Sequence, residues 1–116
     1  MGSFTQEDQE VAPERLAELL GEGGLQLVDV RETYEHDAGR IAGDRHIEMD
    51  RLAAEAGSLD RDAPIVFYCR TGSRSAVATE AFRGAGFEAY NLVGGLVAWV
   101  ERGLPLEPED GKVAPH

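Results

Sequence analysis

The chain contains one cysteine, Cys69, and the segment behind it reads Arg70-Thr71-Gly72-Ser73-Arg74-Ser75. A thiolate is the nucleophilic form of cysteine, and it is stabilised at helix N-termini and beside cationic side chains. Two of the eleven basic residues of the chain, Arg70 and Arg74, lie within five positions of the cysteine, and guanidinium groups bind small oxyanions well. The segment therefore predicts a reactive thiolate next to a site for a small anion.

The segment over 70–75 suits a tight loop that leads into a helix. Gly72 supplies the backbone freedom that such a turn requires, and successive N–H groups of the loop can point inward as an anion-binding nest. Ser73 and Ser75 can cap the helix or donate hydroxyl hydrogen bonds. The alternative is a structural role, because a free cysteine often behaves as a small buried hydrophobe. The flanking arginines and the glycine favour the reactive interpretation.

The loop needs an element on each side to hold it. Ile65–Tyr68 is a continuous apolar run introduced by Pro64, which is typical of a central parallel strand covered on both faces. After the loop, apolar residues recur at helical spacing between Ala78 and Ala85, and glycines end this predicted helix. Cys69 therefore lies where a central strand ends, and ligands bind at that edge of open parallel sheets.

The rest of the chain predicts further alternating elements. We expect a helix after Pro13, a strand over 25–30, a short helix within 31–40, a short edge strand within 41–47, helical turns over 49–56, a strand over 87–92 and a last helix over 94–103. Such alternation predicts an α/β fold, with helices on both faces of a parallel sheet. The sequence shows no internal repeat or linker, so we expect one domain, followed by a loose tail after Pro108.

The composition restricts the classes of partner. The chain has 22 acidic and 11 basic residues and a formal charge of -11, which disfavours nucleic acid and anionic membrane surfaces. No stretch approaches about 20 apolar residues and the N-terminus lacks the pattern of a signal peptide, so we expect no membrane span and a cytoplasmic location. A single cysteine also fits a reducing compartment.

Histidines and a strand-end aspartate are the other candidates for chemistry. His36, His46 and His116 show no metal-ligand spacing and no cluster of cysteines or carboxylates around them. We therefore predict no metal site, and expect these histidines at the surface or in hydrogen bonds. Asp29 ends an apolar segment, and with Arg31 close by a structural ion-pair network is the favoured interpretation.

Several of these segments together resemble the rhodanese family of sulfurtransferases. The resemblance lies in the active-site loop over 69–75, in a first signature over 29–32 with Glu35 and 39–43, and in a closing signature over 94–99. The matching segments cover roughly residues 11–105 in the order and spacing of the family. Two positions depart from its pattern, since Arg40 stands where the family usually has histidine and Glu48 where it often has proline.

The resemblance implies a rhodanese-like fold with a central parallel sheet of about five strands. It places the domain at residues 11–106, between an N-terminal extension over 1–10 and a C-terminal tail over 107–116. It also implies a thiosulfate sulfurtransferase that uses no metal or organic cofactor. In such an enzyme Cys69 takes a sulfane sulfur from a small anionic donor and passes it to cyanide, to a thiol or to a protein acceptor. The residues implied to bind the substrate are Arg70, Thr71, Gly72, Ser73, Arg74 and Ser75.

Two other functions remain open at this point. One is a sulfur-relay module that delivers persulfide to a protein partner with little turnover on thiosulfate. The other is a phosphatase or arsenate reductase of similar fold. Those enzymes place five residues between cysteine and arginine, whereas this chain has four, residues 70–73. The smaller ring is expected to suit one sulfur atom on the cysteine and to crowd a phosphate, which ranks phosphatase activity below sulfur transfer.

Overall fold

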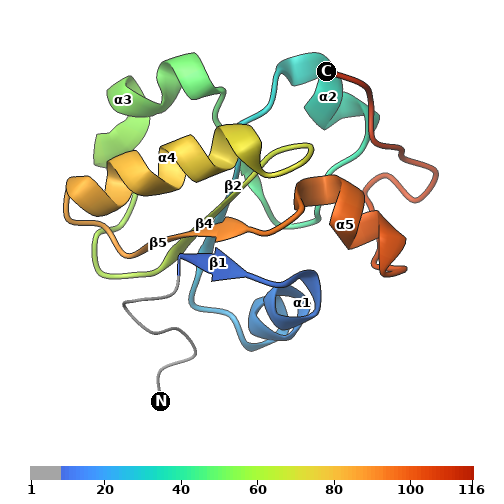
Figure 1. The fold of residues 1–116 in the computed structure, drawn as a ribbon, viewed down its shortest axis with the longest axis horizontal. Coiled ribbons are helices and arrows are strands. Elements are labelled where there is room, and N and C mark those ends of the chain that lie inside the picture. The colour runs from blue at the N-terminus through green and yellow to red at the C-terminus, as the bar shows by residue number, and fades with distance from the viewer. Residues whose placement is uncertain (1–8) are drawn as a thin grey trace.

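The computed structural model describes residues 9–116 (Figure 1). Within these residues the elements are β1 (Glu10–Val11), α1 (Pro13–Glu22), β2 (Gln26–Asp29), α2 (Thr33–Ala38), β3 (Arg45–His46), η1 (Met49–Arg51), α3 (Leu52–Glu55), η2 (Ala56–Ser58), β4 (Ile65–Tyr68), α4 (Ser73–Gly84), β5 (Ala89–Leu92) and α5 (Gly95–Glu101). The helices and strands expected from the sequence are present in the expected order. Strand β1 was not predicted, because two residues carry no periodic pattern.

The strands form one parallel sheet in the order β1-β5-β4-β2-β3. Strand β4 is central, as its apolar run predicted, and β3 is an edge strand. In the register of the sheet, Asp29 pairs with Tyr68 and Phe67 pairs with Asn91. The carboxyl ends of β2, β4 and β5 therefore meet at one edge of the sheet, and Cys69 follows there.

Helices cover both faces of the sheet, which confirms the predicted α/β architecture (Figure 1). The four side chains of β4 are buried with exposed fractions of 0%, and they alternate between the two faces. Ile65 and Phe67 pack with residues of α3 and α4, whereas Val66 and Tyr68 pack with residues of α1 and α5. Cys69 continues the first of these clusters.

Aromatic packing fixes α4 against the central strand. Phe82 of α4 lies between Phe67 and Phe87, with ring centroids 4.9 Å apart in each pair and the rings tilted. Burial of one such side chain stabilises a fold by about 1.5–3 kcal/mol, and tilted pairing adds about 0.5–1.5 kcal/mol. This contact holds the helix that follows the Cys69 loop.

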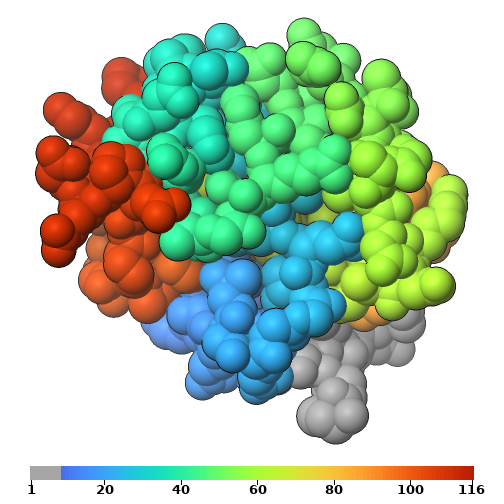
Figure 2. Space-filling model, turned by 180° about the vertical axis from the view of Figure 1, so that it is seen from behind, coloured from blue at the N-terminus to red at the C-terminus, as the bar shows by residue number. Residues whose placement is uncertain are grey.

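The prediction of a loose tail after Pro108 was wrong. The segment has no helix or strand, but it returns across α2, and in Figure 2 it lies in red against the part of the chain coloured cyan to green. The Lys112 N–H donates to the Ala38 carbonyl at 2.9 Å, and the Tyr34 hydroxyl donates to the Pro115 carbonyl at 3.0 Å. Polar and proline-rich segments without periodicity give no sign of such tertiary contacts. The domain boundary at residue 106 stays a prediction.

No helix in residues 9–116 combines the length and the apolar composition that crossing a membrane requires.

Candidate active site

Cys69 lies in a cradle of hydrogen-bond donors between β4 and α4. Its exposed fraction is 0%. The Gly72 N–H donates to the sulfur at 3.1 Å and the Ser75 N–H, in the first turn of α4, at 3.5 Å. The Ser75 hydroxyl oxygen lies 3.4 Å from the sulfur. Converging N–H groups at a helix N-terminus stabilise negative charge, so this arrangement suits a thiolate or a persulfide.

Gly72 and a buried asparagine close the cradle. Gly72 has a φ of 100°, a conformation that glycine adopts without strain. Its carbonyl accepts a hydrogen bond from Asn91 Nδ2 at 3.1 Å, and the Ser75 hydroxyl gives its proton to Asn91 Oδ1 at 2.5 Å. Sequence analysis missed Asn91, although an amide between Tyr90 and Leu92 in an apolar strand is a usable signal.

The N-terminus of α5 holds the outer side of the loop. The Leu96 N–H donates to the Cys69 carbonyl at 2.9 Å and the Val97 N–H to the Arg70 carbonyl at 3.0 Å. A Cβ on Gly95 would come within 2.5 Å of the Arg70 oxygen, so only glycine permits this approach. With these carbonyls facing α5, the loop can turn its N–H groups toward the sulfur. The predicted closing signature thus contacts the predicted loop.

The two arginines of the loop have different surroundings. Arg74 Nη1 and Nη2 donate to the two carboxylate oxygens of Glu35, each at 2.9 Å, and Glu35 is fully buried. Burial would raise the pKa of Glu35, but the hydrogen bonds from Arg74 outweigh it, and the pKa lies below its usual value. Within the described chain, no carboxylate pairs with Arg70, and its Nε is buried without a hydrogen-bond partner. Anion binding by either arginine stays a prediction, and Arg70 is the one of the two without a carboxylate partner among the described residues.

The remaining predicted loop residues, Thr71 and Ser73, are exposed. Of the residues that the structure describes, only Gly72 and Ser75 donate to the sulfur of Cys69. Thr71 and Ser73 therefore form the surface of the loop rather than the lining of the cradle.

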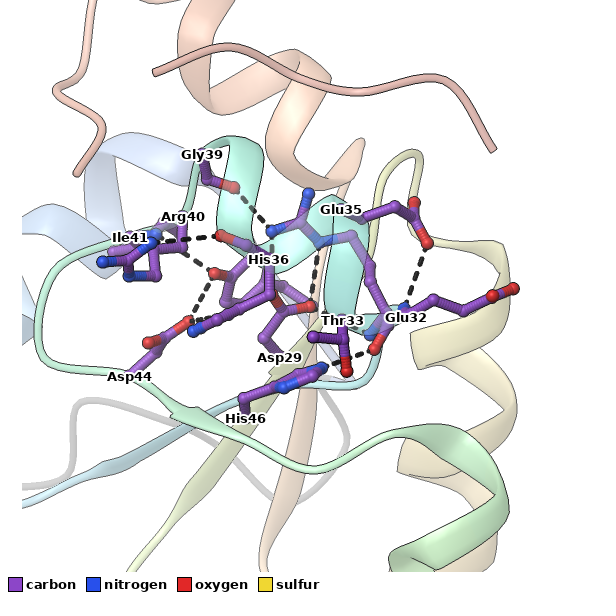
Figure 3. A network of polar contacts seen from close by, with 12 residues as sticks. Asp29, Glu32, Thr33, Glu35, His36, Gly39, Arg40, Ile41, Asp44 and His46 are labelled. Carbon is purple, nitrogen blue, oxygen red and sulfur yellow. Dashed lines mark hydrogen bonds and ion pairs between the residues drawn. The ribbon is translucent and has the colours of Figure 1, made fainter. Parts of the chain in front are cut away.

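A second polar site lies under α2 (Figure 3). Arg31 Nε and Nη2 donate to the carboxylate of Asp29 at 2.9 and 2.7 Å, and Nη2 also donates to the Gly39 carbonyl at 2.7 Å. Both side chains of the pair are fully buried. Burial would raise the pKa of Asp29, but Arg31 outweighs it and the pKa is lowered. The ion pair expected from the sequence is present.

Two histidines stack above this ion pair, and the expectation that no carboxylates surround them was wrong. His36 Nδ1 lies 2.9 Å from Asp29 Oδ2 and 3.6 Å from Asp44 Oδ2. The rings of His36 and His46 are parallel with centroids 4.4 Å apart, and His46 Nε2 lies 2.7 Å from the Arg31 carbonyl oxygen. Residues far apart in sequence converge here, so local spacing could not show the cluster (Figure 3).

This cluster offers donor atoms for a cation but is better suited to internal hydrogen bonds. One atom each from Asp29, His36 and Asp44 lies within 4.8 Å of the others. The Asp29 carboxylate already accepts from Arg31, and Asp44 Oδ2 accepts from the Tyr68 hydroxyl at 2.6 Å. The guanidinium of Arg31 would also repel a metal ion at this place.

The two departures from the family pattern have structural partners. Glu48 Oε2 accepts hydrogen bonds from the Thr33 N–H at 3.0 Å and the Thr33 hydroxyl at 3.1 Å, which fastens the start of α2. Arg40 Nη1 donates to the His36 carbonyl at 3.2 Å, and its Nε lies 3.9 Å from Glu107 Oε1. Glu48 therefore holds the start of α2, and Arg40 links α2 to the C-terminal segment.

A cavity of about 360 Å³ opens beside the Cys69 loop. Its lining consists of Val30, Glu32, Glu48, Met49, Asp50, Arg74 and His116. Val30 and Met49 also pack in the cluster that contains Cys69, and Arg74 belongs to the loop itself. The cavity thus borders the loop that carries Cys69, and Cys69 itself is not part of its lining.

Comparisons with known proteins identify the family of this domain. The family model of the rhodanese-like domain matches residues 12–102. The chain is 39% identical over 92 residues to thiosulfate sulfurtransferase GlpE of Pseudomonas aeruginosa, covering 78% of this chain and 83% of that protein. It is 38% identical over 99 residues to the probable adenylyltransferase/sulfurtransferase MoeZ of Mycobacterium tuberculosis, covering 82% of this chain and 25% of that protein. A solved structure of a rhodanese-related protein from Thermoplasma volcanium has a TM-score of 0.79 and 30% identity, covering 84% of this chain and 96% of the other.

Proposed function

The chain belongs to the rhodanese-like domain family, and from this premise we propose that it is a sulfurtransferase that carries a sulfane sulfur as a persulfide on Cys69. The observation that carries the proposal is the cradle, in which two backbone N–H groups point at the sulfur of the single cysteine. The proposed donor is thiosulfate or a similar small anion, and the proposed acceptor is cyanide or a thiol. A reducing compartment such as the cytoplasm fits an unpaired reactive thiol.

The first half-reaction loads the sulfur. The Cys69 thiolate attacks the sulfane sulfur of thiosulfate, a new S–S bond forms to Sγ, and the S–S bond of thiosulfate breaks as sulfite leaves with the electron pair. The N–H groups of Gly72 and Ser75 offset the negative charge of the persulfide. An acceptor thiolate then attacks the outer sulfur, and Cys69 leaves as thiolate. Two covalent steps of this kind give ping-pong kinetics.

Substrate access requires a small movement, because Cys69 is fully buried. The movement must leave the Gly72 and Ser75 donors in place, because they offset the charge on the sulfur.

The relay alternative has one supporting observation. The matching part of the Mycobacterium tuberculosis relative makes up 25% of that longer protein. A domain of this type therefore also occurs within a longer protein, one named as a probable adenylyltransferase/sulfurtransferase. Transfer to a protein with little turnover on cyanide or free thiols would favour this alternative.

Phosphatase or arsenate reductase activity has less support. Four residues separate Cys69 from Arg74, and the Arg74 guanidinium is held by both carboxylate oxygens of Glu35. A phosphate would have to displace a buried carboxylate to reach that group. Aryl-phosphate hydrolysis by the native protein that disappears in Cys69→Ser would nevertheless favour phosphatase activity over sulfur transfer.

Intact-mass measurement after thiosulfate treatment tests the proposal. The native protein should gain the mass of one sulfur atom, cyanide should remove it, and Cys69→Ser should gain nothing, because serine provides no accessible anion at this site. Ser73→Ala is the matched control, since it changes an exposed loop hydroxyl outside the cradle and should still load. A mass gain that persists in Cys69→Ser would exclude Cys69 as the carrier.

A further inference from the structure

The cavity beside the loop carries an excess of negative charge. Glu32, Glu48 and Asp50 line it, whereas the cation of Arg74 is balanced by the buried carboxylate of Glu35. The other basic side chain of the lining, His116, lies 3.4 Å from Glu32. Arg70, the loop arginine without a carboxylate partner in the described chain, does not line the cavity. An anion in this cavity therefore meets carboxylates without a free cation.

Two of these carboxylates are fixed by the fold. Glu48 accepts two hydrogen bonds from Thr33, and the Glu32 side chain accepts from the Glu35 N–H in the capping box of α2. Asp50 is exposed at the cavity wall and has no hydrogen bond from its side chain in residues 9–116. Charges held in place at a cavity wall discriminate between ligands of opposite sign.

We propose that the sulfur acceptor bound in this cavity is a small thiol that carries a positive charge, such as an aminothiol. The inference rests on the proposed persulfide at Cys69 and concerns the second half-reaction. The acceptor thiolate attacks the outer sulfur and forms a new S–S bond, the bond between that sulfur and Sγ breaks, and Cys69 departs as thiolate. The ammonium group of the acceptor lies toward the carboxylates of Glu48 and Asp50 while its sulfur points to the loop.

The cavity volume fits this class of ligand. A space of about 360 Å³ lies at the small end of the range for small-molecule sites and accommodates a thiol of a few heavy atoms with room for water. One unit charge removed from a partly hydrated wall changes the binding of a charged ligand by about threefold, in opposite directions for cations and anions.

The experiment measures persulfide discharge by two thiols of similar size and opposite charge. Protein loaded with thiosulfate and freed of donor is mixed with 2-aminoethanethiol or with 3-mercaptopropionate, and loss of the sulfur is followed by quenched intact-mass measurement. The ratio of the two second-order rate constants is compared among the native protein, Asp50→Asn and Glu80→Gln. The comparison of ratios cancels the different intrinsic reactivities of the two thiols. Glu80 is an exposed residue of α4 outside the cavity, so its variant controls for net charge.

Asp50→Asn should lower the ratio of cationic to anionic thiol by about fivefold to tenfold, and Glu80→Gln should leave it within about twofold of native. Glu48→Gln is the second variant, since its amide oxygen can still accept from Thr33, and it should act in the same direction. High salt should reduce the native ratio because it screens the wall. An unchanged ratio in both cavity variants, or an equal change for both thiols, would overturn the inference.

The failure of the proposed function has a different signature. If native protein forms no persulfide from any donor, the function and the inference fall together. If persulfide forms and discharges to both thiols, but the ratio of their rate constants is unchanged by the cavity substitutions, the proposed class of acceptor alone is wrong.

Discussion

The Cys69 loop and the polar cluster under α2 use opposite means to hold charge. The loop holds the Cys69 sulfur with N–H groups of one short backbone segment, whereas the cluster holds Asp29 with the side chains of Arg31 and His36. A site made from backbone conformation leaves a short continuous signature of glycine and small residues. A site made from converging side chains has its members scattered along the chain. The first can be found from sequence, and the second becomes visible only in the fold.

The two sites also differ in what their charges do. The negative charge under α2 is matched by a buried guanidinium, so removal of either partner leaves an uncompensated buried charge. The sulfur of Cys69 lies among N–H and hydroxyl donors in a loop that carries two arginines, and such electropositive surroundings favour the thiolate form. We therefore expect substitutions in the cluster under α2 to lower stability, and substitutions in the Cys69 loop to lower activity.

The largest effect is expected for Arg31→Met. Without Arg31 the fully buried carboxylate of Asp29 loses its cation, and the free energy of unfolding should fall by about 3–5 kcal/mol. Denaturant titration measures this change. The control is Arg45→Met, which removes an exposed ion pair with Glu55 and should cost less than about 1 kcal/mol. Equal losses in the two variants would contradict the assigned difference between buried and exposed pairs.

The arginines of the loop should separate in the same way. Arg74→Ala leaves the Glu35 carboxylate buried without its partner, so stability should fall by about 1–3 kcal/mol. Arg70→Ala should change stability much less. It should lower kcat/KM for thiosulfate by a factor that corresponds to about 1.5–3 kcal/mol, the range for hydrogen bonds to charged groups. Steady-state kinetics with thiosulfate and with a neutral persulfide donor measures the difference. Equal losses of Arg70→Ala with both donors would show that Arg70 shapes the loop instead of binding the anion.

The smallest effect is the dependence of stability on pH. The pKa values of Asp29 and Glu35 are lower in the folded chain, because arginine hydrogen bonds outweigh burial. On acidification the unfolded chain takes up protons first, so this stability is complete above about pH 4–5 and is lost as the pH falls further. Burial raises the pKa of Asp44, which acts in the opposite direction.

Urea unfolding between about pH 6 and pH 3 measures the profile. Asp37→Asn, at an exposed position of α2, should leave it unchanged. A profile that stays flat to pH 3 would show that these carboxylates do not titrate differently on folding.

Sequence patterns predicted the parts of the molecule that depend on periodicity and on glycine. The apolar run of β4 was sufficient to predict a central strand, and Gly72 with its neighbours was sufficient to predict the cradle. Asn91 and the carboxylates around His36 were missed because their partners come from other elements. The return of the C-terminal segment over α2 depends on backbone hydrogen bonds, which cannot be predicted from residue types.

The donation of α5 N–H groups to the carbonyls of Cys69 and Arg70 has a consequence for biosynthesis. Chains emerge from the ribosome N-terminus first, so β4 and α4 are made before α5. A nascent chain that stops before Gly94 has the cysteine and the Gly72 and Ser75 donors but lacks the α5 N–H groups that hold the outer side of the loop. The loop therefore gains this outer support only when the last helix has been made.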